Sequence, residues 1–318
     1  MASDSSDGPL GRWTQSVVND ADQRKRLYRA LFYVVTAFFL VTTLFPFYWL
    51  LVLALTPNNL ITSGNWDLPL LRPQGYNWQA FTEVFQQIPF HLYVFNSFVL
   101  AIITTIIVLA IASLAGYVFG RLEFPGRGVL MLGILAISYF PPAAFLVPLF
   151  NAFTGNAVAI PFLGIELFKP PRLVNTPTSM VLPFSALFMP LSIFILTTFY
   201  GQIPDGLEDA ARVEGTTRLG ALFRVIIPLS APGVATAAVL TFISVYNEYF
   251  FSSIMALGNQ PDQWSPLVGG ILSYQTQYTT SFNLMAAASI IGVLPVVILV
   301  VVAQERIVSG LTAGALKE

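Results

Sequence analysis

Six stretches of the chain are long and apolar enough to cross a lipid bilayer as helices. A hydrocarbon core about 30 Å thick needs about 20 consecutive apolar residues in helical form. The stretches that meet this requirement cover residues 30–55, 94–118, 128–150, 178–200, 231–257 and 283–304, and Pro141-Pro142 is expected to break the third. Only 10% of the 318 residues are charged, which is too few to cover the surface of a water-soluble protein of this size. The sequence therefore predicts an all-α membrane protein with six transmembrane helices.

The composition also excludes several kinds of chemistry. The chain has no Cys and a single His, His91, which excludes disulfides, thiolate catalysis and a His-rich metal cluster. Fifteen Lys and Arg residues against sixteen Asp and Glu residues leave no basic excess for binding nucleic acid. The G-x-x-x-x-G-K-[ST] loop that cradles nucleotide phosphates is absent from the sequence. We therefore expect no enzymatic activity, no ATP hydrolysis and no cofactor in this chain by itself.

The basic residues predict the orientation of the spans. Cytoplasmic loops of membrane proteins carry an excess of Lys and Arg. Most of the basic residues fall in the two terminal segments and in the loops after the second and fourth stretches, whereas the opposite side holds only Arg72, Lys169 and Arg172. Both termini are therefore expected in the cytoplasm. This predicts a cytoplasmic tail over 1–29, a transmembrane domain over 30–305 and a second cytoplasmic tail over 306–318.

The most informative polar segment covers residues 200–230 on the predicted cytoplasmic side. Asp205 is expected to cap a helix, with Glu208 in the capping-box position three residues later. Gly215 is expected to end this helix, either as an ordinary C-cap or because the chain needs a positive φ there. Thr216 or Thr217 is expected to cap a second helix. The segment therefore predicts two short helices joined at a glycine.

Apolar residues recur with helical spacing in both of these short helices. The first stripe is Leu207, Ala210 and Ala211, and the second is Leu219, Leu222, Phe223 and Ile226. The charges beside them are mixed and slightly acidic. This pattern favours docking into a groove on another protein, with an amphipathic hairpin lying on lipid headgroups as the alternative.

The same segment resembles the EAA loop of ABC importer permeases, whose pattern is E-A-A, three residues, Gly, nine residues and I-x-L-P. The spacing from Asp209 through Gly215 to Pro228 fits without a gap, although Asp209 replaces Glu, Val225 replaces Ile and Ile227 replaces Leu. Shorter resemblances occur at Asn96-Ser97, GRLEFPG over 120–126, PAAFLVPL over 142–149 and VYNEY over 245–249. GLTAGALK over 310–317 is similar to the tail of the carbohydrate-uptake branch, in particular the second permease of maltose-type sugar transporters.

The resemblance implies the permease subunit of an ATP-driven sugar importer, with a type I ABC importer transmembrane domain and a cytoplasmic EAA coupling helix. It implies four kinds of partner: a second homologous permease, two ABC ATPase subunits that bind ATP and Mg, an extracytoplasmic sugar-binding protein, and the lipid bilayer. It places ATPase coupling at Glu208, Asp209, Ala210, Ala211, Glu214, Gly215 and Leu219. It places further ATPase contacts in the tail at Gly310, Leu311, Thr312 and Gly314.

Glu248 is the only ionisable residue inside any of the six stretches. It lies about 25 Å along the fifth stretch if that stretch is one continuous helix, and therefore in its outer half. An acid at that depth is expected to face the protein interior or a polar cavity. With Asn247 and Tyr249 it is either a candidate for the sugar pathway or a hydrogen-bonded tie between helices.

Two other functions remain open on the sequence alone. An ABC permease for a non-sugar solute would share the loop without the sugar-type tail. An ion-coupled secondary transporter is the less favoured alternative, because such proteins usually carry more intramembrane ionisable residues and an internal repeat.

Overall fold

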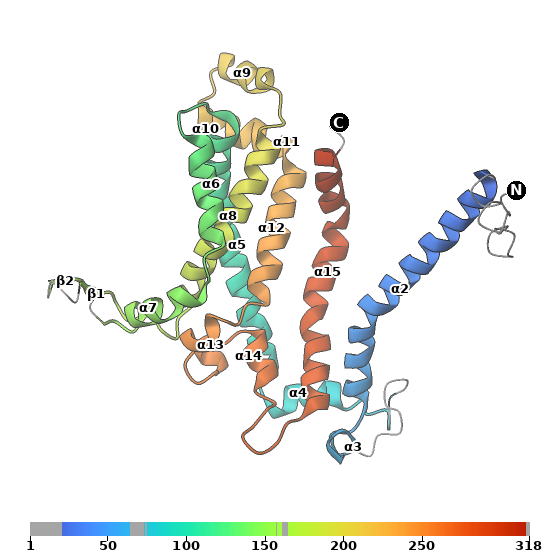
Figure 1. Ribbon diagram of the computed structural model, residues 1–318. Coiled ribbons are helices and arrows are strands. Elements are labelled where there is room, and N and C mark those ends of the chain that lie inside the picture. Colours follow the sequence, from blue (N-terminus) through green and yellow to red (C-terminus); the bar gives the residue numbers. More distant parts are fainter. Residues whose placement is uncertain (1–20, 64–72, 74, 157, 161–164, 316–318) are drawn as a thin grey trace, which may run out of the picture.

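The computed structural model describes residues 21–63, 73, 75–156, 158–160 and 165–315, with side chains apart from those of residues 21, 158–160, 165–168 and 305–315. Helices and one small hairpin make up the described chain (Figure 1). The elements before the hairpin are α2 (Ala21–Leu55), α3 (Asn58–Ser63), α4 (Ala80–Gln87), α5 (Phe90–Arg121), α6 (Arg127–Ser138) and α7 (Ala143–Phe153). The hairpin is β1 (Val158–Ile160) with β2 (Ile165–Phe168). The elements after it are α8 (Thr178–Tyr200), α9 (Asp205–Val213), α10 (Arg218–Ala221), the π-helix η2 (Leu222–Ile226), α11 (Ile227–Leu229), α12 (Ala231–Tyr246), α13 (Ser252–Met255), the 3-10 helix η3 (Pro261–Gln263), α14 (Leu267–Leu272) and α15 (Phe282–Ala315).

Four unbroken helical stretches of the described chain are long and apolar enough to span a membrane: Asp22–Leu55, Phe90–Arg121, Thr178–Tyr200 and Phe282–Gln304. Two further spans are possible if each bent pair counts as one, namely Arg127–Ser138 with Ala143–Phe153 and Arg218–Leu229 with Ala231–Tyr246. Each pair bends by 83°. The number of apolar segments agrees with the six predicted stretches, and the protein is a multi-pass membrane protein.

The third predicted span is broken at Pro141-Pro142 as expected, whereas the fifth ends earlier than predicted. In the third, Pro141 and Pro142 are separated from the end of α6 by two residues. Proline lacks an N–H donor and clashes with the preceding turn, so the helix stops and α7 starts afresh. The fifth was predicted to run to residue 257, but α12 ends at Tyr246. There Asn247 Nδ2 donates to the Ile243 carbonyl at 3.0 Å, and such side-chain bonds compete with continuation of a helix.

The prediction of an all-α chain also needs one small correction. β1 and β2 pair antiparallel, with Ile160 opposite Ile165. Figure 1 shows this hairpin extending sideways from the helical body, beyond α7. The rest of the described chain is helix and connecting turn.

The centre of the bundle is formed by α5, α8 and α12, which approach closely because small residues line their contacts. A Cβ placed on Gly116 of α5 would lie 2.9 Å from the Cβ of Leu196 on α8. A Cβ on Gly233 of α12 would lie only 2.2 Å from Cγ of Phe199 on α8. Ser192 and Thr241 share a hydrogen bond of 3.0 Å between α8 and α12. Small residues and hydroxyl bonds of this kind are the usual means of packing membrane helices.

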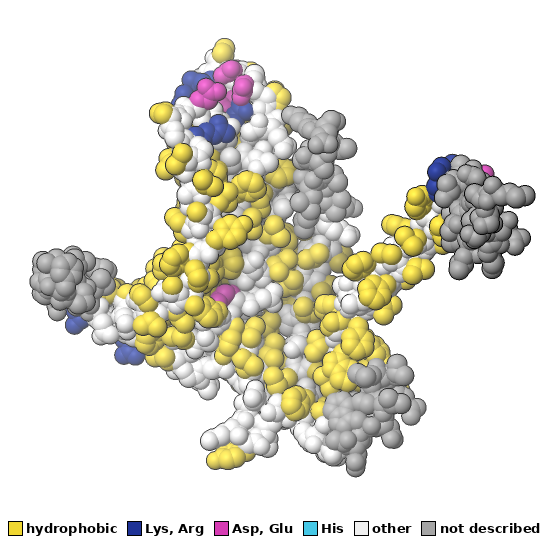
Figure 2. Space-filling view, in the orientation of Figure 1, with side chains coloured by type: hydrophobic (Ala, Val, Ile, Leu, Met, Phe, Trp, Pro, Cys, Tyr) yellow, Lys and Arg dark blue, Asp and Glu magenta, His cyan; other side chains and the backbone are white. Residues whose placement is uncertain are grey.

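The first helix, α2, packs on the bundle only near its C-terminal end. Val52, Ala54 and Leu55 are buried, whereas the apolar side chains between residues 28 and 47 are exposed. Figure 1 shows the N-terminal half of α2 extending away from the other helices. Figure 2 shows hydrophobic side chains along its surface. This half of α2 therefore needs lipid or another membrane chain around it.

Candidate functional site

The predicted coupling segment lies at one end of the molecule, beyond the ends of the membrane-spanning helices (Figure 1). Its first helix is α9, and Pro204 occupies the N-cap position without a side-chain hydrogen bond. The predicted capping box is therefore wrong, because Asp205 is the first helical residue and Glu208 bonds elsewhere. Thr217 caps α10 as one of the two predicted threonines, accepting a hydrogen bond from Gly220 N at 3.1 Å.

Glu208 points from α9 toward the end of α5 and is only 7% exposed. The Tyr117 hydroxyl donates to its Oε1, and Arg121 Nε donates to its Oε2 at 2.9 Å. Arg121 also forms an ion pair of 2.9 Å with Asp205 and donates to the Ile203 carbonyl at 2.5 Å. Sequence reasoning placed Glu208 among the coupling residues but missed Tyr117 and Arg121, which hold it.

The electrostatics of this cluster keep Glu208 charged. Burial alone would raise the pKa of Glu208, but the hydrogen bonds from Tyr117 and Arg121 and the positive charge of Arg121 together hold this pKa below its usual value. A carboxyl whose folded pKa is depressed stabilises the fold above its unfolded pKa of about 4.3, and loses that contribution only as the pH falls through the folded value. Glu208 therefore stays ionised at neutral pH, beside the guanidinium of Arg121.

The opposite face of the segment is open. Asp209, Ala210 and Glu214 are exposed on or beside α9. Four large apolar side chains are exposed as well: Leu207, Val213, Leu219 and Phe223. Figure 2 shows Asp, Glu, Lys and Arg side chains gathered at this end of the molecule. The second predicted apolar stripe is split by the structure, since Leu222 and Ile226 are buried and Leu219 and Phe223 are not.

Gly215 separates the two helices with a φ of +92°, in the left-handed region. A Cβ built there would meet nothing within 4 Å. Backbone conformation, and not lack of space, is therefore what requires glycine at this position. Beyond it the chain passes through the π-helix η2 and bends by 83° before α12.

The three candidate pathway residues lie together in the turn after α12. Asn247 is exposed, while Glu248 and Tyr249 are partly buried. Glu248 Oε1 accepts a hydrogen bond from Phe251 N at 2.8 Å, and Ser252 Oγ lies 3.3 Å from Glu248 Oε2. Glu248 is thus not on a continuous helix as expected, but caps the start of α13. Asn247 also lines a cavity of about 400 Å³ with residues of α2, α14 and α15.

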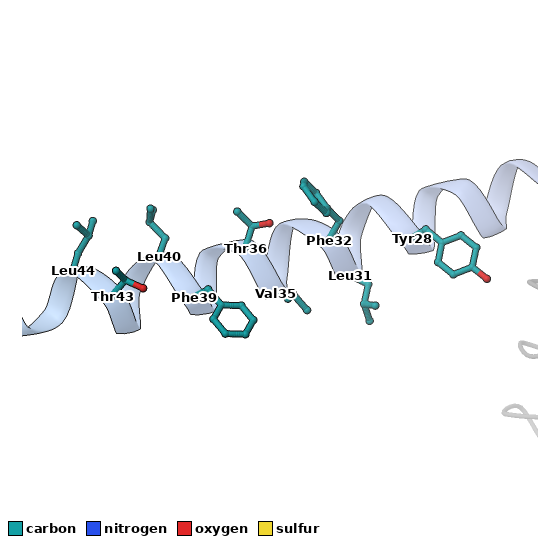
Figure 3. Close-up of a pocket in the computed structure, with 9 residues that line it drawn as sticks. All are labelled: Tyr28, Leu31, Phe32, Val35, Thr36, Phe39, Leu40, Thr43 and Leu44. Atoms are coloured by element: carbon teal, nitrogen blue, oxygen red, sulfur yellow. The ribbon is translucent and has the colours of Figure 1, made fainter. Parts of the chain in front are cut away.

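A larger hollow on α2 is not a substrate site. Figure 3 shows the nine residues that line it, all from this one helix. They are Tyr28, Leu31, Phe32, Val35, Thr36, Phe39, Leu40, Thr43 and Leu44. A binding pocket needs walls from more than one direction to enclose a ligand, and a single helix supplies only one.

The tail residues predicted to contact the ATPase fall on the last part of α15. The backbone of Gly310, Leu311, Thr312 and Gly314 continues this helix, which crosses the predicted domain boundary at residue 305. Their side chains lie outside the described part of the structure.

The overall arrangement matches that of ABC importer transmembrane chains. A chain in the crystal structure of a bacterial ABC transporter involved in the import of the acidic polysaccharide alginate superposes with a TM-score of 0.70 at 19% identity, covering 89% of this chain and 98% of that one. At this identity the likeness shows the fold alone. The class of protein is therefore a multi-pass membrane protein with the ABC importer transmembrane fold.

The family follows from the sequence. Residues 112–312 match the profile of the binding-protein-dependent transport system inner membrane component, and the chain belongs to this family. It is 35% identical to the sulfoquinovosyl glycerol transport system permease protein SmoH of Agrobacterium fabrum, over 91% of this chain and 94% of the relative. It is 31% identical to the trehalose transport system permease protein SugB of Mycobacterium tuberculosis, over 86% and 92%. The trehalose/maltose transport system permease protein MalG of Thermococcus litoralis is also 31% identical, over 92% and 98%.

Proposed function

We propose that this chain is the permease subunit of an ATP-driven importer that moves a sugar across the cytoplasmic membrane, with both termini in the cytoplasm. The observation that carries the proposal is the exposed helical elbow of α9 and α10 at one end of a bundle with the ABC importer fold. The relatives named for trehalose, maltose and sulfoquinovosyl glycerol transport support a sugar as the solute. ATP hydrolysis is assigned to partner subunits, which would hold the ATP and Mg.

The open face of the elbow supports docking to an ATPase subunit. Val213 is 89% exposed, and Leu219 and Phe223 are exposed nearby. Apolar side chains ringed by charge are typical of a protein interface. Asp209 and Glu214 argue against the alternative of a hairpin lying on lipid headgroups, since such helices favour Lys and Arg on their polar side. We assign ATPase coupling to Asp209, Ala210, Ala211, Glu214 and Leu219, with Gly215 shaping the elbow and Glu208 holding it from behind.

A second permease is supported by surfaces that a lone chain leaves uncovered. Non-helical backbone at membrane depth is tolerated only where protein or a water-filled cavity covers it. The break between α6 and α7 instead exposes Tyr139 to 88% and Phe140 to about half. The apolar side chains in the N-terminal half of α2 are likewise exposed. We infer that a homologous permease covers these surfaces and that the sugar passes between the two chains, near the break after α12.

The side opposite α9 supports contact with a sugar-binding protein. The turn between Gln275 and Thr280 is closed by a β-bridge and by a hydrogen bond of 2.8 Å from Thr276 N to the Thr279 carbonyl. This ordered turn presents Tyr278, which is 89% exposed. Aromatic side chains of this kind are common anchors of protein interfaces.

The proposal is tested by isolating the chain from its native membrane with a tag and weighing the intact assembly by native mass spectrometry. We expect this chain with one different permease and two ATPase subunits, and we expect the binding protein of the same system to bind a sugar. Isolation of the chain alone, or only as copies of itself, would contradict the proposal. A binding protein that takes an amino acid or phosphate would favour the non-sugar alternative.

The tail offers a separate prediction. Truncation after Ser309 should leave the spans and the complex intact but lower the stimulation of ATP hydrolysis by sugar and binding protein, because we assign the tail residues to ATPase contacts. Stimulated hydrolysis is measured on the purified complex. Full stimulation in the truncated complex would show the tail to be dispensable.

A further inference from the structure

We infer that Arg121 fixes the coupling helix to α5, so that α9, α5 and α8 move as one body when the ATPase subunits act on α9. This inference rests on the proposed function, because it assigns the path by which ATPase movement enters the membrane domain. Arg121 is a positioning residue in this scheme and contacts neither ATP nor sugar.

The contacts of Arg121 are unusually complete for a residue at the end of a membrane helix. Its side chain is 4% exposed and reaches three acceptors on the coupling segment: Glu208, Asp205 and the Ile203 carbonyl. A guanidinium can hold several acceptors in a fixed fork, whereas a lysine ammonium is a single flexible point charge. Arg121 therefore fixes both the position and the direction of α9.

Tyr117 strengthens this attachment from the preceding turn of α5. Its hydroxyl donates to the Glu208 oxygen that Arg121 Nε does not use. Residues four apart lie on the same face of a helix, so Tyr117 and Arg121 together present one donor surface to Glu208. Both carboxylate oxygens are thus engaged by α5.

The end of α5 is in turn locked to α8. A Cβ on Gly120 would lie 3.0 Å from the Thr197 carbonyl oxygen and 3.2 Å from the Tyr200 Cβ. Together with Gly116 this forms a Gly-x-x-x-Gly seam, which lets helix backbones approach closely. The chain itself joins α8 to α9 over residues 201–204. The coupling helix is therefore attached to the α5–α8 pair twice, once covalently and once through Arg121.

The connection from α9 toward α12 is built differently. It runs through Gly215, the π-helix η2 and the 83° bend at Ser230. Within the described part of the chain, the ion pairs of α9 are those to Arg121 and one of 3.8 Å between Arg212 and Asp209 in α9 itself. Glycines and π-bulges are common sites of helix bending. Any movement of α12 relative to α9 would be taken up at this bend, and it is limited by the packing of Gly233 on Phe199 and by the Ser192–Thr241 hydrogen bond.

Distances between spin labels test directly whether α9 stays fixed to α5. The natural chain has no Cys, so each introduced pair is the only labelled pair in this chain, and the partner subunits are used in Cys-free form. One pair, Gly206→Cys with Val118→Cys, joins α9 to α5; the other, Gly206→Cys with Leu240→Cys, joins α9 to α12. All three sites are exposed. In the assembled complex we expect the α9–α5 distance to stay the same between the nucleotide-free and ATP-trapped states, and the α9–α12 pair reports any bending at Ser230. A change in the α9–α5 distance between the two states would overturn the inference.

Substitution of Arg121 provides a second test, which measures the stimulation of ATP hydrolysis. Arg121→Met should keep ATPase subunits bound while reducing their stimulation by sugar and binding protein about tenfold, and should broaden the α9–α5 distance distribution. Asp205→Asn is the matched control, because Asp205 pairs with the same arginine but its side chain is 89% exposed, where ion pairs contribute little. If the stimulation of ATP hydrolysis and the α9–α5 distance distribution both stay normal in Arg121→Met, Arg121 is not a positioning residue.

Arg121→Met also leaves the charge of Glu208 buried without its ion pair, which can itself prevent assembly. Arg121→Met with Glu208→Gln removes both charges and keeps an acceptor for Tyr117. A double variant that assembles but stays uncoupled supports the inference, and one that regains normal stimulation overturns it. Failure of the unsubstituted chain to bind ATPase subunits would instead refute the proposed function, so the two failures are distinguishable.

Discussion

Replacement of Gly215 by valine should weaken ATPase association and abolish transport while leaving membrane insertion intact. Gly215 has a φ of +92°, which a β-branched residue adopts only at a cost of about 1–3 kcal/mol. Because α9 is held to α5 by Arg121, the strain cannot be relieved by moving α9 and should instead displace α10. The exposed faces of the two helices would then no longer form one docking surface.

Copurification of tagged ATPase subunits with the Gly215→Val chain measures this effect. Gly206→Val is the matched control, since Gly206 also lies on the coupling segment and has open space at its Cβ, but does not have a positive φ. It should retain most of the association. Normal recovery of ATPase subunits with Gly215→Val would contradict the assignment of this elbow as the docking site.

Replacement of Glu248 by leucine should destabilise the membrane domain. The substitution removes the acceptor of Phe251 N and the carboxylate contact of Ser252 at the junction of α12 and α13. A buried donor left without its acceptor costs about 1–3 kcal/mol. Glu248→Gln keeps one acceptor oxygen and should assemble normally. If Glu248 also faces the sugar, the glutamine variant should change the transport rate or the sugar preference.

Thermal unfolding of the purified complex and sugar uptake separate the two roles of Glu248. Ser253→Ala provides a control at the same junction, because Ser253 is exposed and its side chain bonds only to the Phe250 carbonyl among described contacts. A complex with Glu248→Leu that is as stable as the unsubstituted one would rule out the capping role. Unchanged uptake by Glu248→Gln would remove Glu248 from the pathway.

Hydropathy alone predicted the number of apolar segments, because a bilayer demands length and apolarity from each span. The sequence also predicted the break of the third segment at Pro141-Pro142. It did not predict the end of the fifth at Asn247, where local side-chain bonds leave no hydropathy signal. The two short helices joined at Gly215 were also predictable, because the apolar residues on each side of Gly215 recur with helical spacing.

The attachment of α9 to α5 was beyond sequence reasoning. Arg121 and Glu208 are 87 positions apart, and nothing in either local pattern indicates the other. Glu208 even fits a local capping box with Asp205, an interaction that the structure replaces with the contact to α5. Only the close packing of α5 on α8 brings Arg121 within reach. Local patterns thus predicted two short helices joined at Gly215, but not how α9 is fastened to the membrane domain.

Sugar uptake into sealed liposomes tests the proposed function most directly. The chain is reconstituted with its second permease and ATPase subunits, with binding protein and labelled sugar on the side opposite the ATPases. We predict accumulation of sugar against its gradient that requires ATP and stops when the ATPase subunits carry an inactivating substitution. Uptake that proceeds without ATPase subunits, or that follows an imposed ion gradient instead of ATP, would contradict the assignment of this chain as an ATP-coupled permease.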